Sequence, residues 1–216
     1  MAVARAKASN VVEMKQMRLE RIEIPIIGTA PLIMHAWSHK AKEQMLAKQM
    51  KRATTGKEAK DPQRDFEESI YVDSTGLPAF PTIAFKASAV DAAVAMDFKK
   101  TNLRQAFHID GEMAPVVGSA PEPREDMVRV GMGTADIRYR AHFKTWGTVL
   151  PVTINLSMLS VEQLVNLFDA AGFGIGIGEW RPQKDGQFGR FKVASDAEAK
   201  QIGEWIKARN KGAKAA

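Results

Sequence analysis

A glycine-rich loop between an expected helix and an expected strand constrains this chain more than any other feature. The loop reads AAGFGIGIGEWRPQKDGQFGRFKV, from Ala170 to Val193. Chain reversal needs one or two glycines, at the turn positions with positive φ. Here there are six, at Gly172, Gly174, Gly176, Gly178, Gly186 and Gly189. The surplus indicates a backbone that approaches a ligand closely, or one that packs tightly.

The order helix, loop, strand excludes two known phosphate motifs. A dinucleotide fingerprint needs its glycines after a strand and before a helix, and the sequence G-x-x-x-x-G-K-[ST] is absent. Free backbone N–H groups and cationic side chains would still suit phosphate oxygens, and aromatic rings would stack on bases. The loop's candidate nucleic-acid ligands are Gly174, Gly176, Gly178, Trp180, Arg181, Lys184, Gly186, Phe188, Arg190 and Lys192.

A second basic feature lies on the expected strand at 136–144. Side chains of a strand alternate between faces, so every second residue points the same way, about 7 Å apart. One face would carry Ile137, Tyr139, Ala141 and Phe143. The opposite face would carry Arg138, Arg140, His142 and Lys144. A solvated face usually mixes both signs of charge, so this row favours contact with a phosphate chain.

Composition supports a polyanionic partner. The chain has 216 residues and a net charge of +6, with basic residues concentrated at 40–64 and 200–214. The segment 40–64 contributes Lys48, Lys51 and Arg52 as further candidate ligands. Solvated basic faces on an ordinary soluble protein are the alternative. The absence of cysteine, of an apolar signal-like run and of an 18-residue apolar segment predicts a cytoplasmic protein without a membrane partner.

Apolar spacing and capping residues predict an α+β domain with no internal repeat. Alternation predicts strands at 17–27, 127–132, 136–146, 148–156 and 189–194. Helices are expected at 38–53, at 83–96 capped by Thr82, from Ser160 and Gln163 to a stop at Gly172, and at 196–210 capped by Ser195 and Glu198. The stretch TTGKEAKDPQRD reads as a mobile loop, and Gly111–Pro123 as an ordered loop or short linker.

The segment GFGIGIGEWRPQKDGQFGRFKV resembles the glycine-rich signature of the RAMP superfamily of CRISPR proteins. IIGTAPLIMH is similar to that family's first strand and small-Pro-Leu segment, and LPAFPTIAFKASAVDAAV to its turn into the first helix. At this turn Pro81-Thr82-Ile83 departs from the usual Pro-Gly-Ser-Ser. The chain also looks like small proteins of unassigned function from tailed phages and prophages.

This resemblance implies one ferredoxin-like domain, the plan of RNA recognition motifs, with an antiparallel sheet and helices on one face. Its core would span about 17–195, a basic helical insertion about 38–72, and a C-terminal helix about 196–210. RAMP backbone subunits polymerise along a guide RNA. The resemblance therefore implies a non-catalytic protein that binds single-stranded nucleic acid, either RNA or DNA with RNA favoured, self-associates, and meets other effector or phage proteins. No cofactor is expected.

Some RAMP proteins are metal-independent ribonucleases with a histidine near the end of the first strand. His35, His39 and Lys40 occupy that neighbourhood here, which makes a ribonuclease the second hypothesis. His35 and His39 could also hold a metal on a helix, but no third ligand is evident. A structural or interaction protein, for example of a phage particle, whose basic faces meet an acidic partner is the third hypothesis. For a phage protein, single-strand annealing is a variant of the first hypothesis.

Overall fold

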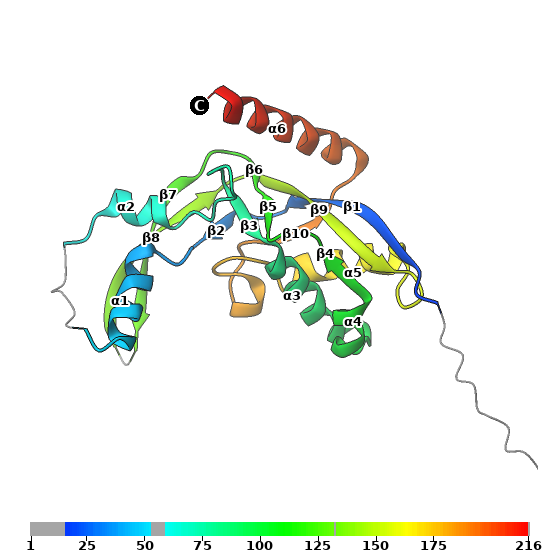
Figure 1. The fold of residues 1–216 in the computed structure, drawn as a ribbon, viewed down its shortest axis with the longest axis horizontal. Helices are drawn as coiled ribbons and strands as arrows, with labels where there is room; N and C mark the ends of the chain where they lie inside the picture. Colours follow the sequence, from blue (N-terminus) through cyan, green and yellow to red (C-terminus); the bar gives the residue numbers. More distant parts are fainter. Residues whose placement is uncertain (1–15, 53–58, 132, 216) are drawn as a thin grey trace, which may run out of the picture.

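The computed structural model describes residues 16–52, 59–131 and 133–215, with backbone alone for 39–41, 130, 134 and 213–215. A mainly antiparallel sheet forms its centre (Figure 1). β1 (Leu19–Gly28) pairs on one side with β10 (Phe191–Val193) and on the other with β9 (Trp146–Asn155). β4 (Phe107–Ile109) and the short β6 (Val117–Gly118) pair with opposite ends of β9.

Two helices that contact each other cover one face of this sheet. They are α3 (Thr82–Ala92), which continues as the 3-10 turn η1 (Ala93–Met96), and α5 (Val161–Gly174). α4 (Lys100–Ala106) follows η1 and leads directly into β4. The core between helices and sheet is fully buried and rich in phenylalanine. Large apolar side chains such as these contribute most to the free energy of folding, because they remove the most apolar surface from water. The largest members of the core include Phe85, Phe107, Phe168, Phe191, Trp146 and Leu150.

The opposite face of the sheet carries a helix as well, which corrects the expectation of helices on one face. α6 (Asp196–Ala215) crosses it and contacts β1, β6 and β9 (Figure 1). Ile202 of α6 is fully buried, and it packs where a Cβ on Gly147 would lie 2.9 Å from its side chain. Among the described residues, no helix is long and apolar enough to cross a membrane.

A three-stranded sheet extends from one end of the molecule. It contains β2 (Leu32–Met34), β8 (Thr134–Phe143) and β7 (Glu122–Val130) in that order. The β7–β8 hairpin, α1 (His39–Gln49) and α2 (Pro62–Glu68) lie together at this end (Figure 1), and α2 contacts β8. β3 (Ala79–Pro81) and β5 (Met113–Pro115) form a small separate ladder.

The α+β class and most strands are as the sequence predicts. The structure adds α2 where a loop was expected, because Asp61 caps two backbone N–H groups and Pro62 suits the first helical turn. The loop segment 53–58 lies outside the described residues. In the final helix the Glu198 carboxylate accepts from the Ser195 backbone N–H at 2.9 Å, half of the expected cap, and the helix runs to Ala215.

Two predicted helix ends are wrong for reasons of tertiary contact. Thr82 does not cap α3, because its hydroxyl donates to the carbonyl of Gly111 at 2.6 Å instead. Gly172 does not end α5, whose Ser160–Gln163 capping box is present as expected. Gly172 lies inside the helix, where β10 packs so closely that a Cβ would come within 2.0 Å of the Phe191 carbonyl oxygen. Close packing therefore requires glycine at this position.

Candidate functional site

The glycines of the loop allow it to fold against the protein's own backbone. A Cβ on Gly189 would lie 1.8 Å from the Ile177 oxygen, and one on Gly186 would lie 1.7 Å from the Trp180 oxygen. Gly178 would meet the Ile33 oxygen of β2 at 2.5 Å. Gly174 has open space around it. Close packing therefore accounts for most of these glycines.

Several loop N–H groups that the sequence predicted as phosphate donors are already used. Gly176 N–H donates to the Ala171 carbonyl at 2.8 Å, and Gly186 N–H to the Arg181 carbonyl at 3.1 Å. The N–H of Gly189 reaches the Pro31 carbonyl at 2.7 Å. The N–H groups of Gly176 and Gly186 are thus occupied within the protein, and the loop side chains supply most of the groups that can meet a ligand.

Trp180 stands at the centre of the loop in an unusual conformation. Its φ is +53°, a region that non-glycine residues enter at a cost of about 1–3 kcal/mol. The backbone there is fixed by Phe188, whose N–H donates to the Trp180 carbonyl at 3.0 Å. The indole remains 42% exposed. The fold thus holds a large aromatic ring at the surface in a strained position, which is typical of a functional site.

Two depressions adjoin at Trp180, and we refer to them together as the Trp180 groove. One, of about 560 Å³, lies toward Pro31, Phe188 and Arg190. The other, of about 270 Å³, lies toward Arg138 and Lys184. The glycine loop forms one wall and the β7–β8 hairpin forms the other. Segments that are distant in the sequence therefore build a single basic surface.

The lining of the Trp180 groove is strongly cationic. Its only carboxylates are those of Asp126 and Glu179. Its cations are Arg124, Arg129, Arg138, Arg140, Arg181, Lys184 and Arg190. Among the described residues, Arg129, Lys184 and Arg190 form no ion pair with a carboxylate, and Arg190 binds only the Gln187 carbonyl, at 3.2 Å. Unpaired cations beside exposed rings suit a phosphate chain whose bases stack.

Sequence reasoning missed the contribution of β7. The guanidinium of Arg124 lies 4.8 Å from the centre of the Phe188 ring, a cation–π contact that holds the ring in the groove. Arg129 lines the other depression. In the observed register Arg124 stands directly opposite Arg140, a pairing that the predicted strands did not include. Only the register shows that the β7 cations join those of the loop.

The basic row on β8 is not a row of free cations, which corrects that prediction. Arg140 is buried, with its guanidinium 3.1 Å from Asp126 and 3.6 Å from Glu179. Lys144 pairs with Glu122 at 2.8 Å, and Arg138 lies 3.7 Å from Asp136. Strand β7 and the loop supply most of these carboxylates.

His142, the remaining member of the β8 row, is kept neutral by its surroundings. Burial, followed by the nearby Arg124 cation, lowers the pKa of the His142 imidazole below its ordinary value of 6.5. Its ring stands edge-on to Phe188 at 6.2 Å between centres. His142 therefore supports an aromatic ring of the groove and adds no positive charge at neutral pH.

The other predicted ligands lie away from the groove. Lys192 on β10 pairs with Glu198 of α6 at 2.9 Å. Lys48, near the end of α1, and the following Lys51 and Arg52 are exposed at the end of the molecule that also carries the β7–β8 hairpin (Figure 1). Gly174 is exposed at the end of α5. None of these five residues lines the Trp180 groove.

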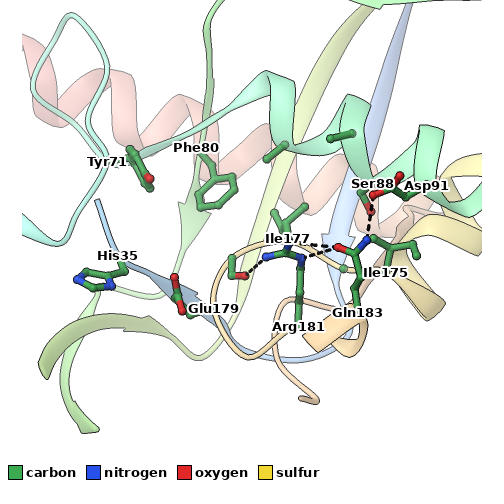
Figure 2. Close-up of a pocket in the computed structure, with 14 residues that line it drawn as sticks. His35, Tyr71, Phe80, Ser88, Asp91, Ile175, Ile177, Glu179, Arg181 and Gln183 are labelled. Carbon is green, nitrogen blue, oxygen red and sulfur yellow. Dashed lines mark hydrogen bonds between the residues drawn. The ribbon is translucent and has the colours of Figure 1, made fainter. Parts of the chain in front are cut away.

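A separate cavity of about 240 Å³, the His35 pocket, lies behind the loop between β2, Tyr71 and α3 (Figure 2). Burial, followed by the Arg140 cation, lowers the pKa of His35, so this imidazole is neutral at pH 7. Burial and the Glu179 carboxylate raise the pKa of Tyr71. The side chains of His39 and Lys40 lie outside the described part of the chain.

Residues 16–52, 59–131 and 133–215 contain no group of three or more His, Asp or Glu side chains that could hold a metal ion. The face of the central sheet that α6 covers also lacks the stacking rings of an RNA recognition motif. The aromatic residues of its strands, Trp146, Phe107 and Phe191, are buried in the core. The Trp180 groove is therefore the candidate site.

Comparison with known proteins adds little. No family model matches the chain, and no curated protein matches it. The solved structures similar to this chain include Cmr6 from Pyrococcus furiosus, at 10% identity and a TM-score of 0.44, over 83% of this chain and all of that one. Similarity at this level indicates neither the fold family nor the function of this chain, so the function is inferred from the site itself.

Proposed function

We propose that this protein binds single-stranded nucleic acid along its sugar–phosphate backbone, in the Trp180 groove. The observation that carries the proposal is the groove's lining, in which four of seven cations have no carboxylate partner among the described residues, around an exposed, strained tryptophan. Phosphates would contact Arg129, Lys184 and Arg190, which have no acidic partner among the described residues. Bases would stack on Trp180 and Phe188.

We also propose a fold and a mode of assembly for the molecule. The chain order β1, α3, β4, β9, α5, β10 and the sheet order β10-β1-β9-β4 support a ferredoxin-like core, the split β-α-β arrangement. We therefore retain the proposal of a single RAMP-like domain that acts without catalysis in the cytoplasm, on RNA rather than DNA, and self-associates along the strand. Single-strand annealing is a variant of this proposal that would use the same groove, whereas no contact among the described residues favours a phage structural role.

Binding is tested by fluorescence anisotropy at several salt concentrations, with labelled single-stranded RNA and DNA of about 12 nucleotides. A triple variant, Arg129→Gln, Lys184→Gln and Arg190→Gln, should bind more than tenfold more weakly, and the slope of log K against log salt should shrink by about 2. The matched control replaces Lys200, Lys207 and Lys211 on exposed α6 by Gln. Equal losses in both variants would count against the groove.

The ribonuclease hypothesis depends on His35 among the residues whose side chains are described. Its neutral imidazole could accept the proton of a 2′-hydroxyl. Cleavage of an all-ribose strand, abolished by 2′-deoxy substitution and by His35→Ala, would replace the non-catalytic proposal with this one.

A further inference from the structure

We propose that the His35 pocket accepts one unpaired base of the bound strand and prefers guanine. The inference rests on the proposed function, because a base reaches the pocket only when its strand lies in the Trp180 groove. Glu179 and Arg181 line both the groove and the pocket. A strand in the groove therefore passes the mouth of the pocket.

The pocket has the size and walls of a site for a single base. Its volume of about 240 Å³ falls below the roughly 300–1,000 Å³ of sites that hold drug-sized ligands. Tyr71 and Phe80 meet edge to face, with ring centres 5.4 Å apart, on one side. Ile177 and Ala84 add apolar surface. An aromatic ring and apolar side chains suit a base that has left its stack.

The polar groups of the pocket fall into two sets (Figure 2). At one end, the Arg181 guanidinium donates to Gln183 at 3.1 Å, and Gln183 donates to Asp91 at 2.9 Å. These groups are occupied by one another. At the other end, the described side chains of His35 and Tyr71 make no hydrogen bond, and the Glu179 carboxylate meets only Arg140, at 3.6 Å.

The second set matches the Watson–Crick edge of guanine. A carboxylate accepts two hydrogen bonds side by side, and guanine alone presents two adjacent donors, N1–H and the 2-amino group, on that edge. The guanine O6 would accept from the Tyr71 hydroxyl or the neutral His35 ring. Adenine, cytosine and uracil each place an acceptor beside their donor, which a carboxylate repels. Glu179 is thus the residue that determines specificity.

The test compares single-stranded RNAs of about 12 nucleotides that are uridine throughout or carry one central G, A, C, inosine or 7-deazaguanine. The G strand should bind roughly tenfold more tightly than the A, C or uridine strands. Inosine, which lacks the 2-amino group, should lose most of that preference. 7-Deazaguanine keeps the Watson–Crick edge and should retain it.

Glu179→Gln should reduce the preference for G to less than about twofold. Its affinity for the all-uridine strand should stay equal or rise, since a carboxylate leaves the groove. Tyr71→Phe should lower the preference partially. The matched control is Glu204→Gln on exposed α6, which should leave the preference unchanged.

The outcomes separate this inference from the proposed function. Binding to all strands without base preference, or a G preference that survives Glu179→Gln, overturns the base pocket and leaves the groove intact. A preference lost with 7-deazaguanine would also overturn it, because the contact would then lie on the other edge of the base. No binding to any strand overturns the proposed function itself.

Discussion

The glycine loop and strand β8 look alike in the sequence, since each presents a run of cations, but the structure uses the two runs differently. On β8, Arg140 is buried against Asp126, and Lys144 is paired with Glu122. In the loop, Lys184 and Arg190 face the groove without an acidic partner among the described residues.

The difference shows that a basic row indicates a polyanion site only when the neighbouring strand fails to neutralise it. The β8 cations mainly hold the hairpin together, whereas the loop cations leave a positive field in the groove. The predictions below test this division between structural and binding cations.

The largest expected effect concerns the buried pair. Asp126→Ala would leave the Arg140 guanidinium, 3% exposed, without its main partner, so the free energy of unfolding should fall by about 3 kcal/mol. Urea denaturation followed by tryptophan fluorescence measures this. Glu122→Ala is the control, because the exposed Lys144–Glu122 pair should contribute less than about 1 kcal/mol. Similar losses of unfolding free energy in the two variants would contradict the distinction between the buried and the exposed ion pair.

The next effect concerns the loop's own glycines. Gly189→Ala combines a positive φ of 64° with a Cβ only 1.8 Å from the Ile177 oxygen, so it should destabilise the fold by about 2 kcal/mol or more. Gly174→Ala, in open space at the end of α5, should be neutral or slightly stabilising. Thermal unfolding of both variants checks this. A harmless Gly189→Ala would mean that the loop does not pack as described.

A smaller effect is expected for the aromatic ring in the groove. Trp180→Ala should weaken binding of a single strand by about 1–2 kcal/mol through lost stacking, without loss of stability, because the indole is exposed. Trp180→Gly should bind as weakly as Trp180→Ala and be the more stable of the two, since glycine relieves the positive φ. Anisotropy and denaturation separate these results. Unchanged affinity would exclude stacking on Trp180.

The last effect appears only in acid and concerns another structural cation, Arg209 of α6, which pairs with Asp73. Hydrogen bonds from Thr75 and Arg209, which outweigh the opposing effect of burial, lower the pKa of Asp73 to about 2 from its usual 3.8. The folded-state pKa lies below the unfolded one, so the stabilisation is present above pH 4 and lost as the pH falls toward 2. Asp73→Asn should remove this pH dependence from the free energy of unfolding. If Asp73→Asn shows the same pH dependence of stability as the wild type, another group is responsible for it.

The sequence predicted the local features and missed those that depend on tertiary contact. Alternation located β1, β8 and β9, and the Ser160–Gln163 capping box located α5, because these signals reside in the segment itself. The pairing of Arg140 with Asp126 could not be predicted, since it depends on the register between two strands.

The candidate site shows the same division. Trp180, Phe188, Lys184 and Arg190 were identified from the loop's composition, and the structure brings them together in the groove. Arg124 and Arg129 were missed because β7 also carries acids, and the strand's own pattern does not show which side chains face the loop.

The most direct test of the central claim is ultraviolet cross-linking of the protein to a single-stranded RNA, followed by identification of the modified peptides by mass spectrometry. The groove predicts adducts on Trp180 or Phe188 in the loop, and on the β7 segment that carries Arg124 and Arg129. Adducts confined to β1, β9 or α6, none of which lines the groove, would contradict it.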